Sequence, residues 1–199
     1  MPGGPFPRIR AAVAALLLAA LAGCGINTIP AKEETAKAKW AEIENQYQRR
    51  ADLVPNLVAT VQGFARQEKE VLTAVTEARA RATSVRLSAD DLSDPAKVAQ
   101  FEAAQQQLGG ALGRLLVTVE RYPELKSSQN FLELQSQLEG TENRIAIARR
   151  DYNEAARAYN TEIRTFPSRI TAEIVYGAKP LAYFEAVTPG ANQAPKVAF

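Results

Sequence analysis

The chain has 199 residues, of which 24 are basic and 22 acidic, and it contains no histidine and one cysteine. This charge balance disfavours nucleic acid as the main partner, because nucleic-acid-binding domains usually carry a clustered basic excess. The absence of histidine removes the commonest metal ligand and the usual general base near neutral pH, and a single cysteine excludes an internal disulfide.

The N-terminal residues have the three parts of an export signal. Arg8 and Arg10 precede the apolar run 11–22, which leads through Leu-Ala-Gly to Cys24. A membrane-spanning helix needs about 20 apolar residues, so this run is short for one. The order Leu-Ala-Gly-Cys resembles a bacterial lipobox. It predicts that residues 1–23 are a lipoprotein signal peptide and that Cys24 is acylated, by chains such as palmitate.

An uncleaved N-terminal membrane helix with an incidental cysteine is the alternative anchor. Either anchor places the remaining chain on the extracytoplasmic side of a membrane. Gly25 stands where an inner-membrane retention signal often has aspartate, which favours the outer membrane if the cell is Gram-negative. Residues 24–30 are predicted to be a short tether.

After the tether, apolar residues recur at alternating spacings of four and three, which indicates helices that pack against partner helices. The first stripe comprises Ala36, Trp40, Ile43, Tyr47, Arg50, Val54, Leu57, Val61, Phe64, Glu68, Val71, Val75 and Ala78. Arg50 and Glu68 are its charged members. Each lies at an end or rim of the bundle, or forms a paired buried charge that fixes helix register. They are 18 residues apart, about 27 Å on one straight helix, so separate partners are expected.

Pro55 interrupts this stripe. The unbroken phase favours one helix kinked at the proline. Helix length favours a break, because residues 31–84 as a single helix would span about 80 Å. Asp52 is a competent N-cap that would place Pro55 in a first turn, where proline is tolerated. The prediction is a helix boundary at residues 51–55.

Two further stripes follow. Asp94 and Pro95 predict an N-cap with proline at the first helical position. The helix after them should end before Pro123. Its stripe is Val98, Phe101, Gln105, Leu108, Leu112, Leu115, Val119 and Tyr122. Ser127 or Ser128 can cap the last long helix, which should end near residues 166–167. Its stripe is Phe131, Leu134, Leu138, Thr141, Ile145, Ala148, Tyr152, Ala155 and Tyr159.

Within the sequence LGGALG, residues 108–113, Gly109 and Gly113 lie four apart, which predicts close approach of a neighbouring helix.

No stretch has the period of two that a strand requires, so the fold class is predicted as all-α. The expected architecture is an antiparallel four-helix up-and-down bundle with long helices, spanning residues 31–168. Residues 169–187 are expected to form a short apolar segment that packs on the bundle, and residues 188–199 a flexible tail.

Two blocks, residues 40–80 and 122–168, closely resemble the LemA family of bacteria. The first begins WAEIENQYQRR, and the second includes YPELKSSQNF and RRDYNEAARAYN. The resemblance implies a four-helix bundle held at the membrane by its N-terminus. Many relatives use an N-terminal membrane helix, whereas this chain carries a lipobox. The family brings no catalytic residue and no ligand.

The residues themselves offer no catalytic constellation built on histidine. Glu139 and Glu142 share a helical face, as paired carboxylates would, but acidic residues three apart on a charge-rich helix are usually solvated. The sequence SADDLSD, residues 88–94, lacks the glycine and the terminal glutamate of a calcium loop. Catalytic, cofactor and metal sites are therefore expected to be absent, and Cys24 is the one predicted site residue.

The predicted function is a membrane-anchored, non-enzymatic scaffold or adaptor of the cell envelope. Its partners would be the membrane and another envelope protein, with no nucleic acid; the sequence does not set the oligomeric state. The alternative is a binding module for an amphiphilic small molecule or an envelope component held between helices.

Overall fold

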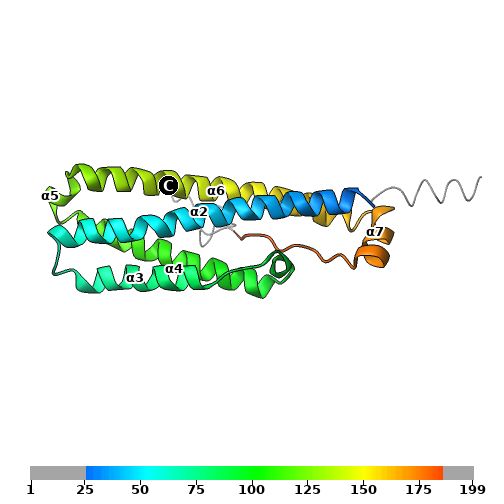
Figure 1. The fold of residues 1–199 in the computed structure, drawn as a ribbon, viewed down its shortest axis with the longest axis horizontal. Helices are drawn as coiled ribbons and strands as arrows, with labels where there is room; N and C mark the ends of the chain where they lie inside the picture. Colours follow the sequence, from blue (N-terminus) through cyan, green and yellow to red (C-terminus); the bar gives the residue numbers. More distant parts are fainter. Residues whose placement is uncertain (1–25, 186–199) are drawn as a thin grey trace, which may run out of the picture.

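The computed structural model describes residues 26–185, and four long helices dominate this part of the chain. They lie side by side and alternate in direction, which makes the molecule elongated (Figure 1). These helices are α2 (Thr28–Phe64), α3 (Lys69–Ser84), α4 (Pro95–Val119) and α6 (Gln129–Glu162). The shorter elements are η1 (Ala89–Ser93), α5 (Pro123–Lys126), α7 (Ser168–Thr171) and η2 (Ala172–Tyr176). Residues 26–185 contain no strand, so the all-α prediction is confirmed.

Several predictions fall outside the described residues. The signal peptide 1–23, Cys24 and the tail 188–199 all lie there. The tether prediction is tested only at its end, where α2 already begins at Thr28, earlier than expected. Pro30 then lies in the first turn of the helix, where its missing N–H has no intrahelical partner to lose.

The four helices differ in length, and the core is divided accordingly. Helices α2 and α6 pair along most of the molecule, whereas α3 and α4 lie along only part of them (Figure 1). One buried cluster lies among α3, most of α4 and the adjoining halves of α2 and α6. The other lies between the remaining halves of α2 and α6, where η1, the start of α4 and the C-terminal segment complete the packing. Its centre is aromatic: Trp40, Tyr47, Phe101, Tyr152 and Phe184.

Residues 178–185, which we call the strap, run back along α6 and are held to it by side chains. The Nδ2 of Asn160 donates to the carbonyl oxygen of Leu181 at 2.8 Å, and the amide of Leu181 donates to Oδ1 of Asn160 at 2.8 Å. Asn153 makes the same two bonds with Phe184, at 3.0 and 2.9 Å. The two asparagines are seven residues apart, which is a rise of about 10.5 Å along the helix. Their partners in the strap are three residues apart, which is about 10 Å of extended chain, so the two spacings match.

Pro55 does not end a helix, so the boundary predicted at residues 51–55 is wrong. Helix α2 is continuous from Thr28 to Phe64. In a regular helix the amide of residue 55 donates to the carbonyl oxygen of Ala51, and proline has no amide hydrogen to donate. The Nε of Arg79, on α3, donates to this carbonyl oxygen at 2.7 Å. A neighbouring helix therefore replaces the missing hydrogen bond.

The break in the first stripe lies ten residues beyond Pro55. Ala65 leaves the helical region, with φ −125° and ψ 55°, and the chain turns through residues 65–68. The predicted core residue Phe64 is 48 % exposed, whereas Ala65 is fully buried. Leu72 is likewise buried where Val71 was expected, and Val71 is half-buried. The apolar stripe is displaced by one residue only around the turn, since Val75 and Ala78 are buried as the heptad spacing predicted.

The contact between Arg79 and Ala51 makes a prediction about Pro55. Arg79→Met is expected to lower the free energy of unfolding by about 1.5 kcal/mol, because the Ala51 carbonyl loses a charged donor. In a Pro55→Ala background, the restored amide at position 55 can donate to the same oxygen, and the cost should fall well below that value. Urea denaturation of the four proteins measures the coupling. Equal costs in both backgrounds would show that Arg79 does not compensate for the proline.

Candidate functional site

A buried arginine lies at the centre of α2. Arg50 is only 4 % exposed. Its Nη2 donates to the backbone oxygen of Gln105 at 2.9 Å and to Oε1 of the same residue at 2.8 Å. Its Nη1 donates to the two carboxylate oxygens of Glu142 at 3.0 and 3.3 Å. The guanidinium carbon also lies 4.9 Å from the centre of the Tyr47 ring, within cation–π range. Arg50 is therefore a paired buried charge that links α2 to α4 and α6.

A second arginine–carboxylate pair lies beside the strap. The Nη2 of Arg149 donates to Oε1 of Glu102 at 2.8 Å and to the backbone oxygen of Glu185 at 2.7 Å. Its guanidinium carbon lies 4.8 Å from the centre of the Phe184 ring. Burial raises the pKa of Glu102, and the charge of Arg149 opposes that rise. The pair joins α4, α6 and the strap at one point.

Glu68, the other charged member of the first stripe, lies at the end of the bundle. Its Oε1 accepts from the hydroxyl of Tyr122 at 2.7 Å and from Nη2 of Arg121 at 3.1 Å. These bonds tie the turn before α3 to the end of α4. Glu68 and Arg50 thus have separate partners, as their spacing predicted.

Gly109 and Gly113, two of the three glycines of α4, do not mark a close helix crossing. A Cβ at Gly109 would meet Nη1 of Arg50 at 3.7 Å, which is ordinary van der Waals contact. A Cβ at Gly113 would meet nothing within 4 Å. The predicted close approach of a neighbouring helix is therefore wrong for Gly113, and Gly109 merely borders the Arg50 guanidinium.

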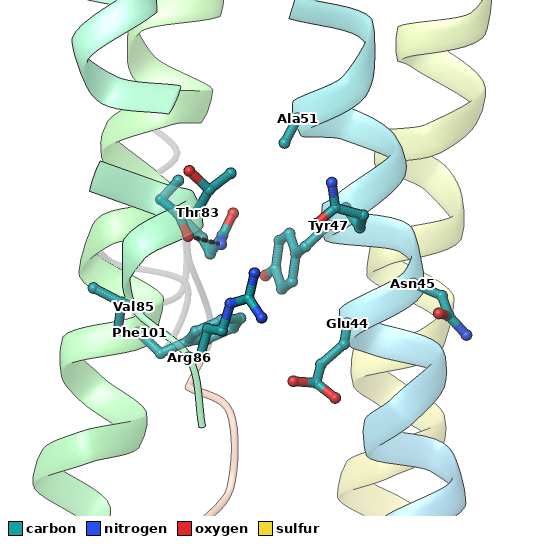
Figure 2. Close-up of a pocket in the computed structure, with 11 residues that line it drawn as sticks. Glu44, Asn45, Tyr47, Ala51, Thr83, Val85, Arg86 and Phe101 are labelled. Carbon is teal, nitrogen blue, oxygen red and sulfur yellow. Dashed lines mark hydrogen bonds between the residues drawn. The ribbon is translucent and has the colours of Figure 1, made fainter. Parts of the chain in front are cut away.

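Open grooves flank the contacts that Arg50 makes with Gln105 and Glu142. Two of them, of about 300 and 370 Å³, share Tyr47 and Gln105 in their walls. In the first, the Tyr47 ring lies between α2 and α3, and the side chains of Glu44 and Arg86 extend into the space beside it (Figure 2). The buried Nε of Arg50 has no hydrogen-bond partner among the described residues. An aromatic wall with charges of both signs suits an amphiphilic molecule better than it suits bond cleavage.

The paired carboxylates considered from the sequence do not form an acid–base pair. Glu142 is engaged by Arg50, whereas Glu139 is exposed and accepts from Nε2 of Gln135 at 2.9 Å. The two therefore share a helix without sharing a site.

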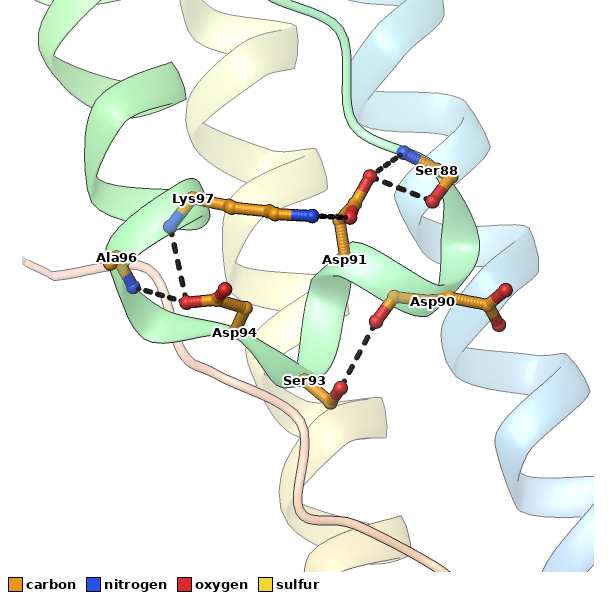
Figure 3. A network of polar contacts seen from close by, with 7 residues as sticks. All are labelled: Ser88, Asp90, Asp91, Ser93, Asp94, Ala96 and Lys97. Atoms are coloured by element: carbon orange, nitrogen blue, oxygen red, sulfur yellow. Dashed lines mark hydrogen bonds and ion pairs between the residues drawn. The ribbon is translucent and has the colours of Figure 1, made fainter.

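The acidic loop 88–94 is a capping device (Figure 3). Asp91 forms an ion pair with Lys97 and accepts from the amide and the hydroxyl of Ser88 at 2.8 and 2.7 Å. Lys97, and then Ser88, hold the pKa of Asp91 well below its usual range. Asp94 caps α4 by accepting from the amide of Ala96 at 2.9 Å. Within residues 26–185 no cluster of three or more potential metal ligands occurs.

The polar residues that hold the strap were not found from the sequence. Asn153, Asn160 and Arg149 resemble the solvated residues of an amphipathic helix. A signal was present in the seven-residue spacing of the two asparagines, which places them on one face beside the apolar stripe. Their partners are backbone groups of an irregular segment, which no side-chain pattern reveals.

No described helix has both the length and the hydropathy that crossing a bilayer requires. Cys24, the predicted lipidation site, lies outside the described residues.

The LemA family model matches residues 39–199. The chain is 29 % identical to magnetosome protein MamQ 2 of Paramagnetospirillum magneticum, over 80 % of this chain and 64 % of that protein. It is 29 % identical to magnetosome protein MamQ of Magnetospirillum gryphiswaldense, over 76 % and 61 % of the two chains. It is 24 % identical to protein LemA of Metamycoplasma hominis, over 66 % and 56 %. The chain thus spans less than two thirds of the length of these relatives.

Proposed function

The chain belongs to the LemA family, and from this premise we propose that it is a non-enzymatic scaffold or adaptor of the cell envelope, anchored through acylated Cys24 on the extracytoplasmic side of a membrane. The observation that carries this proposal is the start of α2 at Thr28, four residues after Cys24. Helix α2 has 37 residues and is about 55 Å long. An anchor at Cys24 would hold this long bundle by one end and present its sides to other proteins.

The engaged side chains of the bundle agree with a structural role. Two ion pairs cross the helix contacts, Arg50 with Glu142 and Arg149 with Glu102. Both arginines also donate to backbone oxygens. Pairs of this kind fix the register of helices more than they add stability. Such a bundle would keep its surface in one fixed arrangement for a partner.

The anchor is tested by Cys24→Ser in the full chain. The variant is expected to lose metabolic labelling by an alkyne fatty acid and to leave the membrane fraction or accumulate unprocessed, because the acyl chains supply the membrane affinity. Labelling, fractionation and intact mass are measured together, with Gly25→Ser as the control at the neighbouring position. A Cys24→Ser protein that stays in the membrane at wild-type mass would support the uncleaved N-terminal helix instead.

The adaptor role is tested by photo-crosslinking in cells from exposed apolar positions. Val117 on α4 is 72 % exposed and Leu132 on α6 is also exposed. A photoreactive residue at either position is expected to capture a defined envelope protein, whereas one at the exposed polar position Gln107 should not. Adducts with lipids and abundant neighbours alone would contradict the adaptor role.

The groove in Figure 2 favours a second candidate function, the binding of an amphiphilic molecule. Its volume of about 300 Å³ and its Tyr47 and Phe101 walls fit a short apolar group, and Arg86 offers a charge for an anionic head. Native mass spectrometry of the protein purified from membranes tests this function. A copurifying amphiphile that is lost in Arg86→Glu would favour it.

A further inference from the structure

Exposed apolar side chains gather at one end of the molecule. Residues 166–176, which we call the tip, comprise the turn before α7 together with α7 and η2. Six of the eleven large apolar side chains that are exposed among the described residues belong to the tip or to the neighbouring Ile26. Ile174 is 80 % exposed and Phe166 is 72 % exposed. The others of this group are Ile26, Ile170, Val175 and Tyr176. A cluster of this kind marks a surface that contacts something else.

The tip lies beside the start of α2 (Figure 1). The hydroxyl of Tyr176 donates to the backbone oxygen of Ile26 at 2.6 Å. Lys32 pairs with Glu162 at 2.5 Å, and the hydroxyl of Ser168 donates to the same carboxylate at 2.5 Å. Lys32, and then Ser168, lower the pKa of Glu162, so this carboxylate is charged at neutral pH. These bonds hold the tip against the first turns of the helix.

Chain length places the tip close to the membrane anchor. Cys24 is two residues from Ile26, a span of at most about 7 Å. The alternative anchor, a membrane helix over the apolar run 11–22, would also enter the bilayer just before this point. Side chains that penetrate a bilayer interface lie about 5–10 Å deep, so the tip is within reach of the surface for either anchor.

The charge of the tip region suits a lipid surface. The tip itself contains one basic and one acidic residue, Arg169 and Glu173, which pair at 2.8 Å, and the flanking Arg164 and Lys179 add two positive charges. All four are exposed. Basic residues beside exposed isoleucine and phenylalanine are the composition of interfacial membrane-binding segments.

We propose that the tip is a membrane-contact surface: Phe166, Ile170, Ile174 and Val175 insert into the interface of the bilayer that holds the N-terminus, and the bundle stands on this end. The basic residues then face anionic headgroups. The inference rests on the proposed anchoring and adds to it an orientation. The far end of the bundle, with Val117 and the turn at residues 65–68, projects away from the membrane.

The test uses the full acylated chain, reconstituted in vesicles of brominated phosphatidylcholine mixed with phosphatidylglycerol. Bromine quenches tryptophan only at close range. Ile174→Trp and Phe166→Trp are compared with Val117→Trp, a matched replacement of an exposed apolar residue at the opposite end. The wild-type emission, from the buried Trp40, is subtracted. Because all three replaced side chains are exposed, the variants are expected to fold, and circular dichroism checks this.

The tip replacements are expected to lose most of their added emission in brominated vesicles, and Val117→Trp to lose little. If the wild-type protein does not float with the vesicles, the anchoring fails and the orientation fails with it. If the protein floats but Ile174→Trp and Phe166→Trp are not quenched, the anchoring stands and the membrane-contact surface is overturned. Equal quenching at both ends would show a bundle lying flat on the bilayer and would also overturn it.

Discussion

Asn160→Ala is expected to release the strap from α6 and to lower the free energy of unfolding by about 3 kcal/mol. Asn160 is buried and satisfies both the amide and the carbonyl of Leu181, at 2.8 Å each. The replacement leaves two buried backbone groups without partners, and each such group costs about 1–3 kcal/mol. Detachment of the strap relieves that cost but exposes Leu181 and Phe184, so stability falls by either route.

Hydrogen exchange and fluorescence measure this effect. In Asn160→Ala, the amides of residues 178–185 should exchange faster, and the emission of Trp40 should change because Phe184 stacks on its ring at 5.7 Å. Asn143→Ala is the matched control, since Asn143 is an exposed asparagine of the same helix. Unchanged exchange in residues 178–185 would show that the apolar contacts alone hold the strap.

Arg50→Met is the second change with a large expected effect, a loss of about 2–3 kcal/mol in the free energy of unfolding. Methionine fills part of the space but cannot donate, so Oε1 of Gln105 loses its charged donor inside the core. Truncating one member of a buried polar cluster costs more than replacing the whole cluster by apolar residues.

A change at Glu142, the ion-pair partner of Arg50, should have a much smaller effect than Arg50→Met. The side chain of Glu142 is 45 % exposed, so Glu142→Gln should cost well under 1 kcal/mol. Arg50→Lys should recover little, because a single ammonium group cannot reach Gln105 and Glu142 with the geometry of the guanidinium fork. Chemical denaturation of the four proteins separates these cases. A Glu142→Gln loss as large as that of Arg50→Met would assign the stabilisation to the ion pair rather than to the bonds with Gln105.

Much of the helical core could be predicted from periodicity alone. The stripes placed Trp40, Leu108 and Tyr152 in the core, and all three are buried. The N-caps could also be predicted: Asp94 caps α4, and Ser128 caps α6 by accepting from the amide of Phe131 at 3.4 Å. These features depend on residues within one or two helical turns of each other, so they can be predicted from the local sequence.

The misplaced helix boundary has a different cause. Helix α2 continues through Pro55, and the carbonyl oxygen of Ala51, which the proline leaves without an amide donor, accepts from Arg79 of the next helix, a contact that the local sequence does not reveal. Helix length was also a poor guide, because the bundle contains helices of unequal length. Residues 169–187 were expected to pack on the bundle, but the hydrogen bonds that hold the strap were not predicted, because they join asparagine side chains to backbone atoms of an irregular segment.

The paired asparagines have a consequence for how this chain tolerates change. Substitutions at Tyr183, which is exposed between the two fixed points, leave all four hydrogen bonds intact. A single inserted or deleted residue between Leu181 and Phe184 does not, since it moves one fixed point about 3.3 Å along the strap. An insertion in α6 between Asn153 and Asn160 rotates one asparagine about 100° away from the strap. In this part of the molecule the number of residues is constrained more strictly than their identity.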